Sequence, residues 1–144
     1  MTNDIYHDGI KKMARMTITT KKLKQADAAI RLDNRLCGDR VDIELCCNDK
    51  VITALYHKVR GCLLCEAAAN IVAQHSVGAT VTELEGITEQ LINLLKNNDN
   101  SNISFDSPWQ ELSLLGPVSS HKSRHQCVLL PFQAVQQALA KISQ

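Results

Sequence analysis

Apolar and polar residues alternate in DRVDIELCC, residues 39–47, where every second residue from position 41 is apolar: Val41, Ile43, Leu45 and Cys47. A period of two is typical of a strand with one buried face. Residues 51–59, VITALYHKV, are rich in strand formers and follow the turn residues Asn48-Asp49-Lys50. A further short strand is predicted around residues 28–32. The three segments indicate an antiparallel meander rather than a parallel sheet.

From residue 61 onward the apolar spacing becomes helical. Helices are predicted for residues 62–77, for residues 80–95 behind a capping box of Thr80 and Glu83, for a short segment after Pro108, and for the residues after Pro131. One more helix is predicted at residues 4–15. Strands first and helices afterwards favour an α+β fold, in which helices pack on one face of a small three-stranded antiparallel sheet.

Composition limits the number of domains, the kinds of partner and the cellular location to be expected. The length of 144 residues fits one domain spanning residues 1–144, and a net charge of +1 gives no electrostatic reason to expect nucleic acid or an anionic membrane as partner. The first residues lack the apolar core of a signal peptide, and no apolar run approaches the length of a membrane span. We therefore expect a cytoplasmic protein. In a reducing compartment its six cysteines are free thiols, metal ligands or catalytic groups.

Several cysteines lie where predicted elements begin or end. Cys37 and Asp39 flank Gly38 and point the same way in an extended segment, so they could chelate one ion. Cys62 lies where a strand gives way to a helix, and the helix dipole there lowers a thiol pKa. Cys127 is predicted in a loop before the last helix. These residues could meet at one edge of the sheet, although each cysteine taken singly is more typical of a buried core residue than of a ligand.

Three strings in this order, Cys37-Gly38-Asp39-Arg40, Gly61-Cys62 and Arg124-x-x-Cys127, resemble the U-type iron-sulfur assembly family, which includes IscU, the amino-terminal domain of NifU, and SufU. The resemblance runs from about residue 5 to the last helix. It implies a metal or cluster site formed by Cys37, Asp39, Cys62 and Cys127. It also implies that Arg124 supports a thiolate.

The resemblance implies one of two roles for that site. A scaffold of this family receives sulfur from a cysteine desulfurase, assembles a transient two-iron, two-sulfur (2Fe-2S) cluster and passes it to apo iron-sulfur proteins. A SufU-like member holds zinc at the same positions and acts as a zinc-dependent sulfurtransferase. The long segment between Cys62 and Cys127 resembles SufU-like members most. A scaffold is favoured over an enzyme, and an interaction module without metal is the third alternative.

The candidate persulfide acceptors are Cys37 and Cys127, since a loop thiol is accessible. The chain also departs from the family. Arg35-Leu36 precedes Cys37 where an asparagine-proline pair is usual, and the proline-rich chaperone loop of IscU-like members is missing. Cys65 stands where the family has a small residue, one helical turn after Cys62, and is either a substitute fourth ligand or a core residue. Cys46 and Cys47 are strand neighbours on opposite faces, so they are not expected to share a metal.

Overall fold

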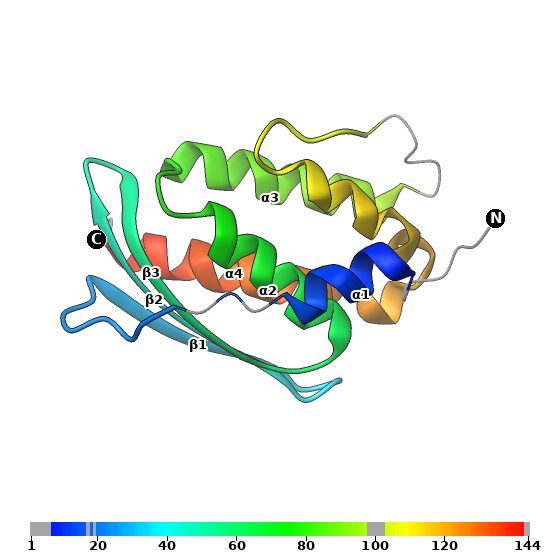
Figure 1. Ribbon diagram of the computed structural model, residues 1–144, viewed down its shortest axis with the longest axis horizontal. Coiled ribbons are helices and arrows are strands. Elements are labelled where there is room, and N and C mark those ends of the chain that lie inside the picture. The colour runs from blue at the N-terminus through cyan, green and yellow to red at the C-terminus, as the bar shows by residue number, and fades with distance from the viewer. Residues whose placement is uncertain (1–6, 17, 19, 98–102, 143–144) are drawn as a thin grey trace.

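The computed structural model describes residues 7–16, 18, 20–97 and 103–142, and Figure 1 traces them from the amino-terminal helix to the last helix. Three strands follow a short first helix, and the remaining helices come after the sheet. The elements are α1 (Asp8–Arg15), β1 (Ala28–Asn34), β2 (Asp39–Asn48), β3 (Val51–Arg60), α2 (Leu63–His75), α3 (Val81–Lys96), the 3-10 helices η1 (Gln110–Ser120) and η2 (Lys122–Arg124), and α4 (His125–Ile142). Residues 4–6 of the predicted first helix lie outside the described part.

The sheet is the predicted meander, with β2 between β1 and β3 and both pairings antiparallel. Asp49 and Lys50 join β2 to β3 with positive φ angles of 52° and 65°, which is the two-residue turn that matches the twist of a hairpin. At the other end of β2, Asn34 pairs with Asp39 across the turn from β1. The predicted strands and their order are confirmed.

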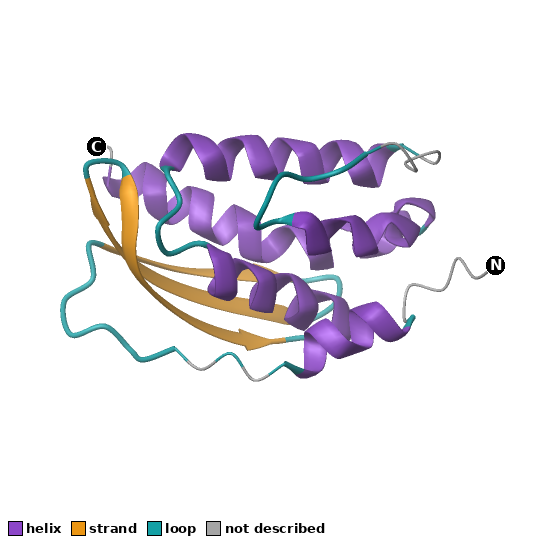
Figure 2. Ribbon diagram, turned by 45° about the horizontal axis from the view of Figure 1, so that its top comes forward, coloured by secondary structure: helices purple, strands orange, loops and turns teal. Residues whose placement is uncertain are grey.

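All the helices lie on one side of the sheet, as Figure 2 shows. The alternation in β2 explains this layering, because Val41, Ile43 and Leu45 are 0–1% exposed and face the helices. The opposite face is charged, and Asp42 accepts from Arg31 there at 2.7 Å. The predicted α+β architecture, with helices on one face of a three-stranded antiparallel sheet, is confirmed.

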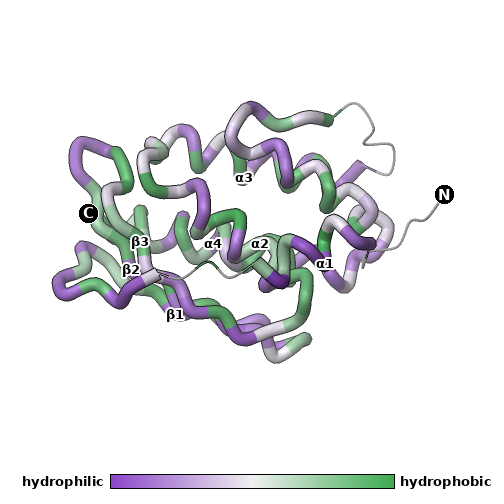
Figure 3. The backbone as a smooth tube through the Cα atoms, viewed as in Figure 1, coloured by the Kyte–Doolittle hydropathy of each residue, from purple (hydrophilic) through white to green (hydrophobic). Residues whose placement is uncertain are grey.

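Helix α2 runs through the middle of the helical layer and packs against α1, α4 and β3. Its sequence LLCEAAANIVAQH is apolar on nearly every side, and α2 is mostly green in Figure 3. Such a helix belongs in a core. Asn70 ties α1 to it by donating from Nδ2 to the Met13 carbonyl at 2.8 Å. The packing fixes the position at which α2 begins, and that position matters for the site.

The last helix differs from the prediction. Helix α4 begins at His125 and contains Pro131, so Cys127 lies in its first turns and not in a loop. The sequence predicts that the helix starts after Pro131 because a proline lacks an N–H and disrupts the helical bond to the residue four before it, here Cys127. The burial of Val128 and Phe132, both 0% exposed, outweighs that loss.

The segment after Pro108 also differs from the prediction. Its helix is a 3-10 helix, which begins at Gln110 and continues through Gly116-Pro117 to Ser120. Trp109 precedes it, is 0% exposed and donates from Nε1 to Glu83 Oε2 at 2.8 Å. Within the described residues, no helix combines the length and the apolar character needed to cross a membrane.

Candidate metal centre

The turn between β1 and β2 places two of the predicted ligands. Gly38 has a φ of 73°, a left-handed conformation that glycine adopts without steric cost. The carbonyl of Asn34 accepts from the N–H of Gly38 at 2.8 Å and from that of Cys37 at 3.3 Å. Asn34 Oδ1 accepts from the N–H of Leu36 at 3.2 Å. These bonds hold Cys37 and Asp39 on the two sides of the glycine.

Cys62 lies at the junction of β3 and α2, directly beside Asp39. It is the N-cap residue of α2, and its N–H donates to Asp39 Oδ1 at 2.9 Å. The other carboxylate oxygen, Oδ2, lies 3.9 Å from Cys62 Sγ. A Cβ on Gly61 would come within 2.5 Å of Asp39 Oδ1, so only glycine allows this close approach. The carboxylate therefore connects the β1–β2 turn to the start of α2.

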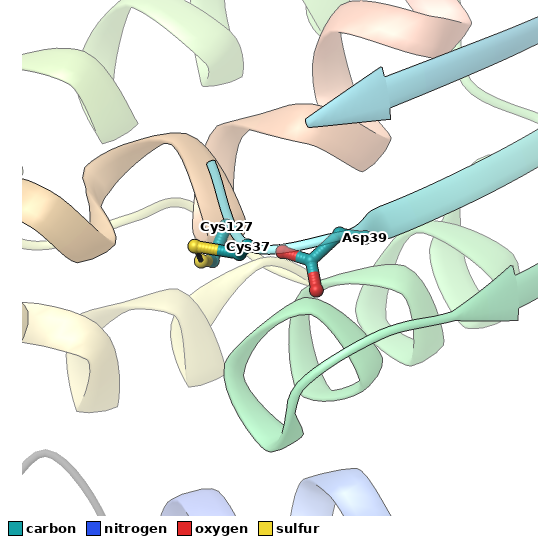
Figure 4. A group of neighbouring side chains, drawn as sticks. All are labelled: Cys37, Asp39 and Cys127. Carbon is teal, nitrogen blue, oxygen red and sulfur yellow. Dashed lines mark hydrogen bonds between the residues drawn. The ribbon is translucent and has the colours of Figure 1, made fainter. Parts of the chain in front are cut away.

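Cys127 reaches the same place from α4. Its Sγ lies 3.3 Å from Cys37 Sγ, and Figure 4 shows the two sulfurs together with the Asp39 carboxylate beside them. One ligand atom each from Cys37, Asp39 and Cys127 falls within 4.8 Å of the others. Cys62 Sγ lies 3.9 Å from Asp39 Oδ2 and is not in this group of three. The structure thus brings all four predicted ligand residues to one end of the sheet.

Burial governs the protonation of this group. Removal from solvent, followed by contacts with Cys37 and Asp39, raises the pKa of the Cys127 thiol far above its ordinary range. Arg124 is the nearby cation, with Nη1 3.9 Å from Cys37 Sγ. Metal ions bind thiolates rather than thiols, so binding here must release protons.

Cys65 lies in the core, in the first turn of α2. It is 0% exposed, and burial together with the negative charge of Asp39 raises its thiol pKa well above the usual value. Cys65 is not among the three residues whose ligand atoms come together. Its role as a substitute fourth ligand stays a prediction.

Cys46 and Cys47 lie at the far end of β2. A bulge interrupts the pairing between them. Cys46 Sγ donates to the Gln25 carbonyl at 3.3 Å, and the N–H of Cys47 donates to Asp27 Oδ2 at 2.9 Å. Burial, followed by the charge of Asp27, raises the pKa of the Cys47 thiol. Neither cysteine belongs to the group at the other end of the strand.

Two residues that support the site were not predicted from the sequence. Asn34 is 7% exposed, holds the turn and donates from Nδ2 toward Cys127 Sγ at 3.9 Å. Gly61 provides the space for Asp39. An asparagine three residues before a thiol is a turn signal that could have pointed to Asn34. The need for Gly61 depends on a contact between segments far apart in the chain.

Three thiols and one carboxylate form a donor set that suits tetrahedral zinc or iron-sulfur chemistry. Soft thiolate sulfur favours zinc and iron-sulfur clusters over magnesium or calcium. The harder carboxylate oxygen leaves one position that exchanges more readily.

Comparisons with known proteins point to one group of relatives. No protein-family model matches the chain. The iron-sulfur cluster assembly scaffold protein IscU of Thermotoga maritima is 23% identical over 140 residues, which cover 96% of this chain and 95% of that protein. A crystal structure of the amino-terminal part of a nitrogen-fixing NifU-like protein from Brucella abortus superposes with a TM-score of 0.90 at 29% identity, covering 98% of this chain and 96% of that one.

A third relative shares the fold. The putative iron-sulfur cluster assembly scaffold protein for the SUF system from Fervidobacterium islandicum AW-1 superposes with a TM-score of 0.80 at 21% identity, covering 94% of this chain and 96% of that one. Each of the three similarities spans nearly the full length of both proteins, so it includes the sheet end that carries the thiols.

Proposed function

We propose that this chain, which is similar over nearly its whole length to IscU and NifU-like iron-sulfur cluster assembly scaffolds, assembles a cluster on Cys37, Asp39, Cys62 and Cys127 and passes it to apo iron-sulfur proteins. The cluster is the protein's cargo, and we propose the two-iron, two-sulfur (2Fe-2S) type. It is held transiently.

The observation that carries this proposal is the buried carboxylate among thiols. Asp39 is 1% exposed, yet Cys62 Sγ lies 3.9 Å from one of its oxygens and the Cys37–Cys127 sulfur pair lies within 4.8 Å. Burying a charged group is costly unless an opposite charge or a metal compensates it. The N–H of Cys62 satisfies Oδ1 of this carboxylate, and a metal ion held among the thiols would supply the opposite charge that a backbone N–H lacks.

Sulfur arrives, in this proposal, from a cysteine desulfurase as a persulfide. Cys37 is partly exposed and has Arg124 near its sulfur, so it is the first acceptor. Cys127 was proposed as an acceptor on the expectation that it lies in a loop, but it is 0% exposed. Its sulfur lies 3.3 Å from that of Cys37, so it can receive sulfur from Cys37 by exchange.

Zinc-bound sulfur transfer is the second candidate function, and the donor set itself favours it. Three thiolates and a carboxylate also satisfy one tetrahedral zinc ion. In that case zinc would hold the thiolates and the protein would pass sulfur rather than a cluster. The similarity in fold to the SUF-system protein does not separate the two roles, because both use the same residues.

We place this activity in the reducing cytoplasm and assign it to one scaffold domain of residues 1–144. This placement rests on the sequence, because six cysteines used as free thiols or metal ligands suit a reducing compartment.

Metal and sulfide analysis tests the proposal. The protein is made without added zinc and incubated anaerobically with a cysteine desulfurase, cysteine and ferrous iron. We expect iron and acid-labile sulfide in equal amounts with a visible charge-transfer band. A colourless protein that retains stoichiometric zinc, with added sulfur on Cys37, would favour the sulfur acceptor. A protein that binds no metal would contradict both candidates.

A further inference from the structure

The outer face of the sheet, which the helices leave uncovered, is basic at the end that carries the candidate metal centre. Opposite residues of neighbouring strands share a face, so the strand pairing defines two rows there. The row nearer the β1–β2 turn is Asp33, Arg40 and Arg60, and the next row is Arg31, Asp42 and Lys58. Arg40 directly follows Asp39, and Arg60 directly precedes Gly61-Cys62. The basic face and the thiols therefore lie at the same end of the sheet.

Positive charge exceeds negative charge in these two rows. Four cations share the face with two carboxylates, and each carboxylate already pairs with an arginine at an N–O distance of 2.7 Å. The other two cations, Lys58 and Arg60, are exposed and form no ion pair with the described residues. An excess of two positive charges is thus concentrated on one face of a chain whose net charge is only +1.

The geometry of these cations suits an anionic group from outside the chain. Arg40 and Arg60 are direct partners across β2 and β3, and like charges placed directly opposite each other destabilise a sheet. A hollow of about 190 Å³ lies among the charged side chains, and it is lined by Arg31, Arg40, Asp42, Lys58 and Arg60. An anionic group seated in this hollow would offset the repulsion between the two arginines.

An exposed leucine at the same end favours a protein as the source of that anionic group. Leu36 lies in the β1–β2 turn directly before Cys37 and is 90% exposed, more than any other large apolar residue of the described part. A small inorganic anion in the hollow would leave Leu36 in water, whereas a protein surface spanning this end of the sheet would bury it. Interfaces between proteins combine such apolar contacts with complementary charge.

We propose that this face is the docking surface for the acidic side of the protein that accepts the cluster. Its basic patch consists of Arg31, Arg40, Lys58 and Arg60. The inference rests on the proposed function, because it names the partner that takes cargo from the same end of the sheet. Opposite charges speed the encounter of two proteins and orient them. An acceptor whose carboxylates meet the basic patch has its empty ligands brought to the end of the sheet where Cys37 and Asp39 lie.

The first experiment measures cluster transfer to an acidic apo-ferredoxin at low and at high salt. Lys58→Gln/Arg60→Gln removes the excess charge and leaves both ion pairs in place. The matched control is Lys24→Gln/Lys96→Gln, which changes the net charge equally at exposed positions outside the two rows. A third variant, Lys58→Arg/Arg60→Lys, keeps both charges. Iron and sulfide analysis before mixing checks that every variant carries the same load.

The second experiment needs no cluster. The zinc-loaded full-length protein is mixed with the same ferredoxin and treated with a carbodiimide, which joins a lysine amine to a carboxylate that it touches. Peptide mass spectrometry then locates the joined lysines. Lys58 is the lysine of the basic patch, and Lys96 at the end of α3 is the exposed comparison.

We expect Lys58→Gln/Arg60→Gln to transfer its cluster about 10-fold more slowly than the wild type at low salt, because the steering charge is gone. Salt screens exposed charges, so the difference should shrink to less than about 2-fold at high salt. The matched control and the charge-keeping variant should transfer at the wild-type rate. In the second experiment Lys58 should be joined to the ferredoxin and Lys96 should not.

An unchanged transfer rate in Lys58→Gln/Arg60→Gln, equal slowing in the matched control, or cross-links that spare Lys58 would overturn the inference. Inhibition of transfer by phosphate beyond that of chloride at equal ionic strength would also overturn it, because the hollow would then be a site for a small anion. If the wild-type protein transfers no cluster at all, the proposed function fails, and the cross-links at Lys58 still decide whether an acidic protein docks on this face.

Discussion

The two ends of β2 both carry cysteines next to an aspartate, and they differ in what surrounds them. At the first end, Cys37 and Asp39 meet the start of α2 and the first turns of α4. At the second end, Cys46 and Cys47 hydrogen-bond to the loop before β1, through Gln25 and the exposed Asp27. The number of thiols in a stretch of sequence therefore does not identify a metal site. The convergence of separate chain segments does.

The carboxylates near the two ends of β2, Asp39 and Asp27, differ in their exposure to solvent. Asp39 is 1% exposed and is held by the N–H of Cys62, with thiols around it. Asp27 is exposed and bonds the N–H of Cys47, where water screens its charge. A buried carboxylate needs compensation that an exposed one does not. The following predictions test this difference between the two ends.

The largest effect is expected from removing a thiol at the first end. Cys37→Ser, Cys62→Ser and Cys127→Ser each replace a soft thiolate by a hard hydroxyl, so zinc or cluster binding should weaken by more than the roughly 10–100-fold that loss of a supporting residue causes. Cys46→Ser and Cys47→Ser serve as matched controls and should bind nearly as the wild type. Titration with zinc against a competing chelator measures all five. Full retention by Cys62→Ser would remove that residue from the site.

A smaller loss is expected from adding one methyl group at Gly61. The new Cβ in Gly61→Ala would lie 2.5 Å from Asp39 Oδ1, so either the carboxylate or the strand-to-helix junction must move. Metal affinity should fall about 10–100-fold, as it does when a supporting residue is lost. Gly86→Ala is the control, because among the described residues a Cβ there would meet nothing within 4 Å. Equal affinities in the two variants would mean that Asp39 does not need its present position.

Asp39→Ala should affect release more than binding. The three cysteines still supply thiolates, so stoichiometric zinc should still occupy the site at a lower affinity, while loss of the exchangeable ligand should slow transfer to an apo-ferredoxin. Occupancy is measured by metal analysis and transfer by the rise of the ferredoxin absorbance. If both are unchanged, Asp39 is only a turn residue, and Cys65 becomes the leading candidate for the fourth ligand.

The smallest effect concerns thiol reactivity at the second end. The raised pKa of Cys47 keeps it protonated to higher pH than an ordinary cysteine, and only the thiolate is alkylated. Its alkylation rate should therefore keep rising with pH after the rate for an unfolded cysteine peptide has levelled off. Asp27→Asn removes the charge and should speed alkylation at a given pH. Peptide mass spectrometry after timed iodoacetamide treatment gives both rates, and a pH profile identical to that of the peptide would contradict the account.

The antiparallel meander, and the packing of helices on one of its faces, were predictable from local pattern. The alternation at Val41, Ile43 and Leu45 indicates which face of the sheet is buried. The start of α4 was not, because Pro131 is a local signal against helix and the burial of Val128 and Phe132, which outweighs it, is a tertiary effect. The same limit applies to the site. Motif resemblance named its four candidate ligands, but the low exposure of Cys127 and the need for Gly61 follow from contacts between distant segments.

Cluster transfer is the most direct test of the central claim that the first end of β2 holds iron-sulfur cargo for delivery. The protein is loaded anaerobically with iron and sulfide, separated from free reagents and mixed with an apo-ferredoxin. We predict that the ferredoxin gains a cluster as this protein loses its own, and that Cys46→Ser transfers at the wild-type rate. Iron and sulfide that stay bound while the ferredoxin remains empty would contradict the account.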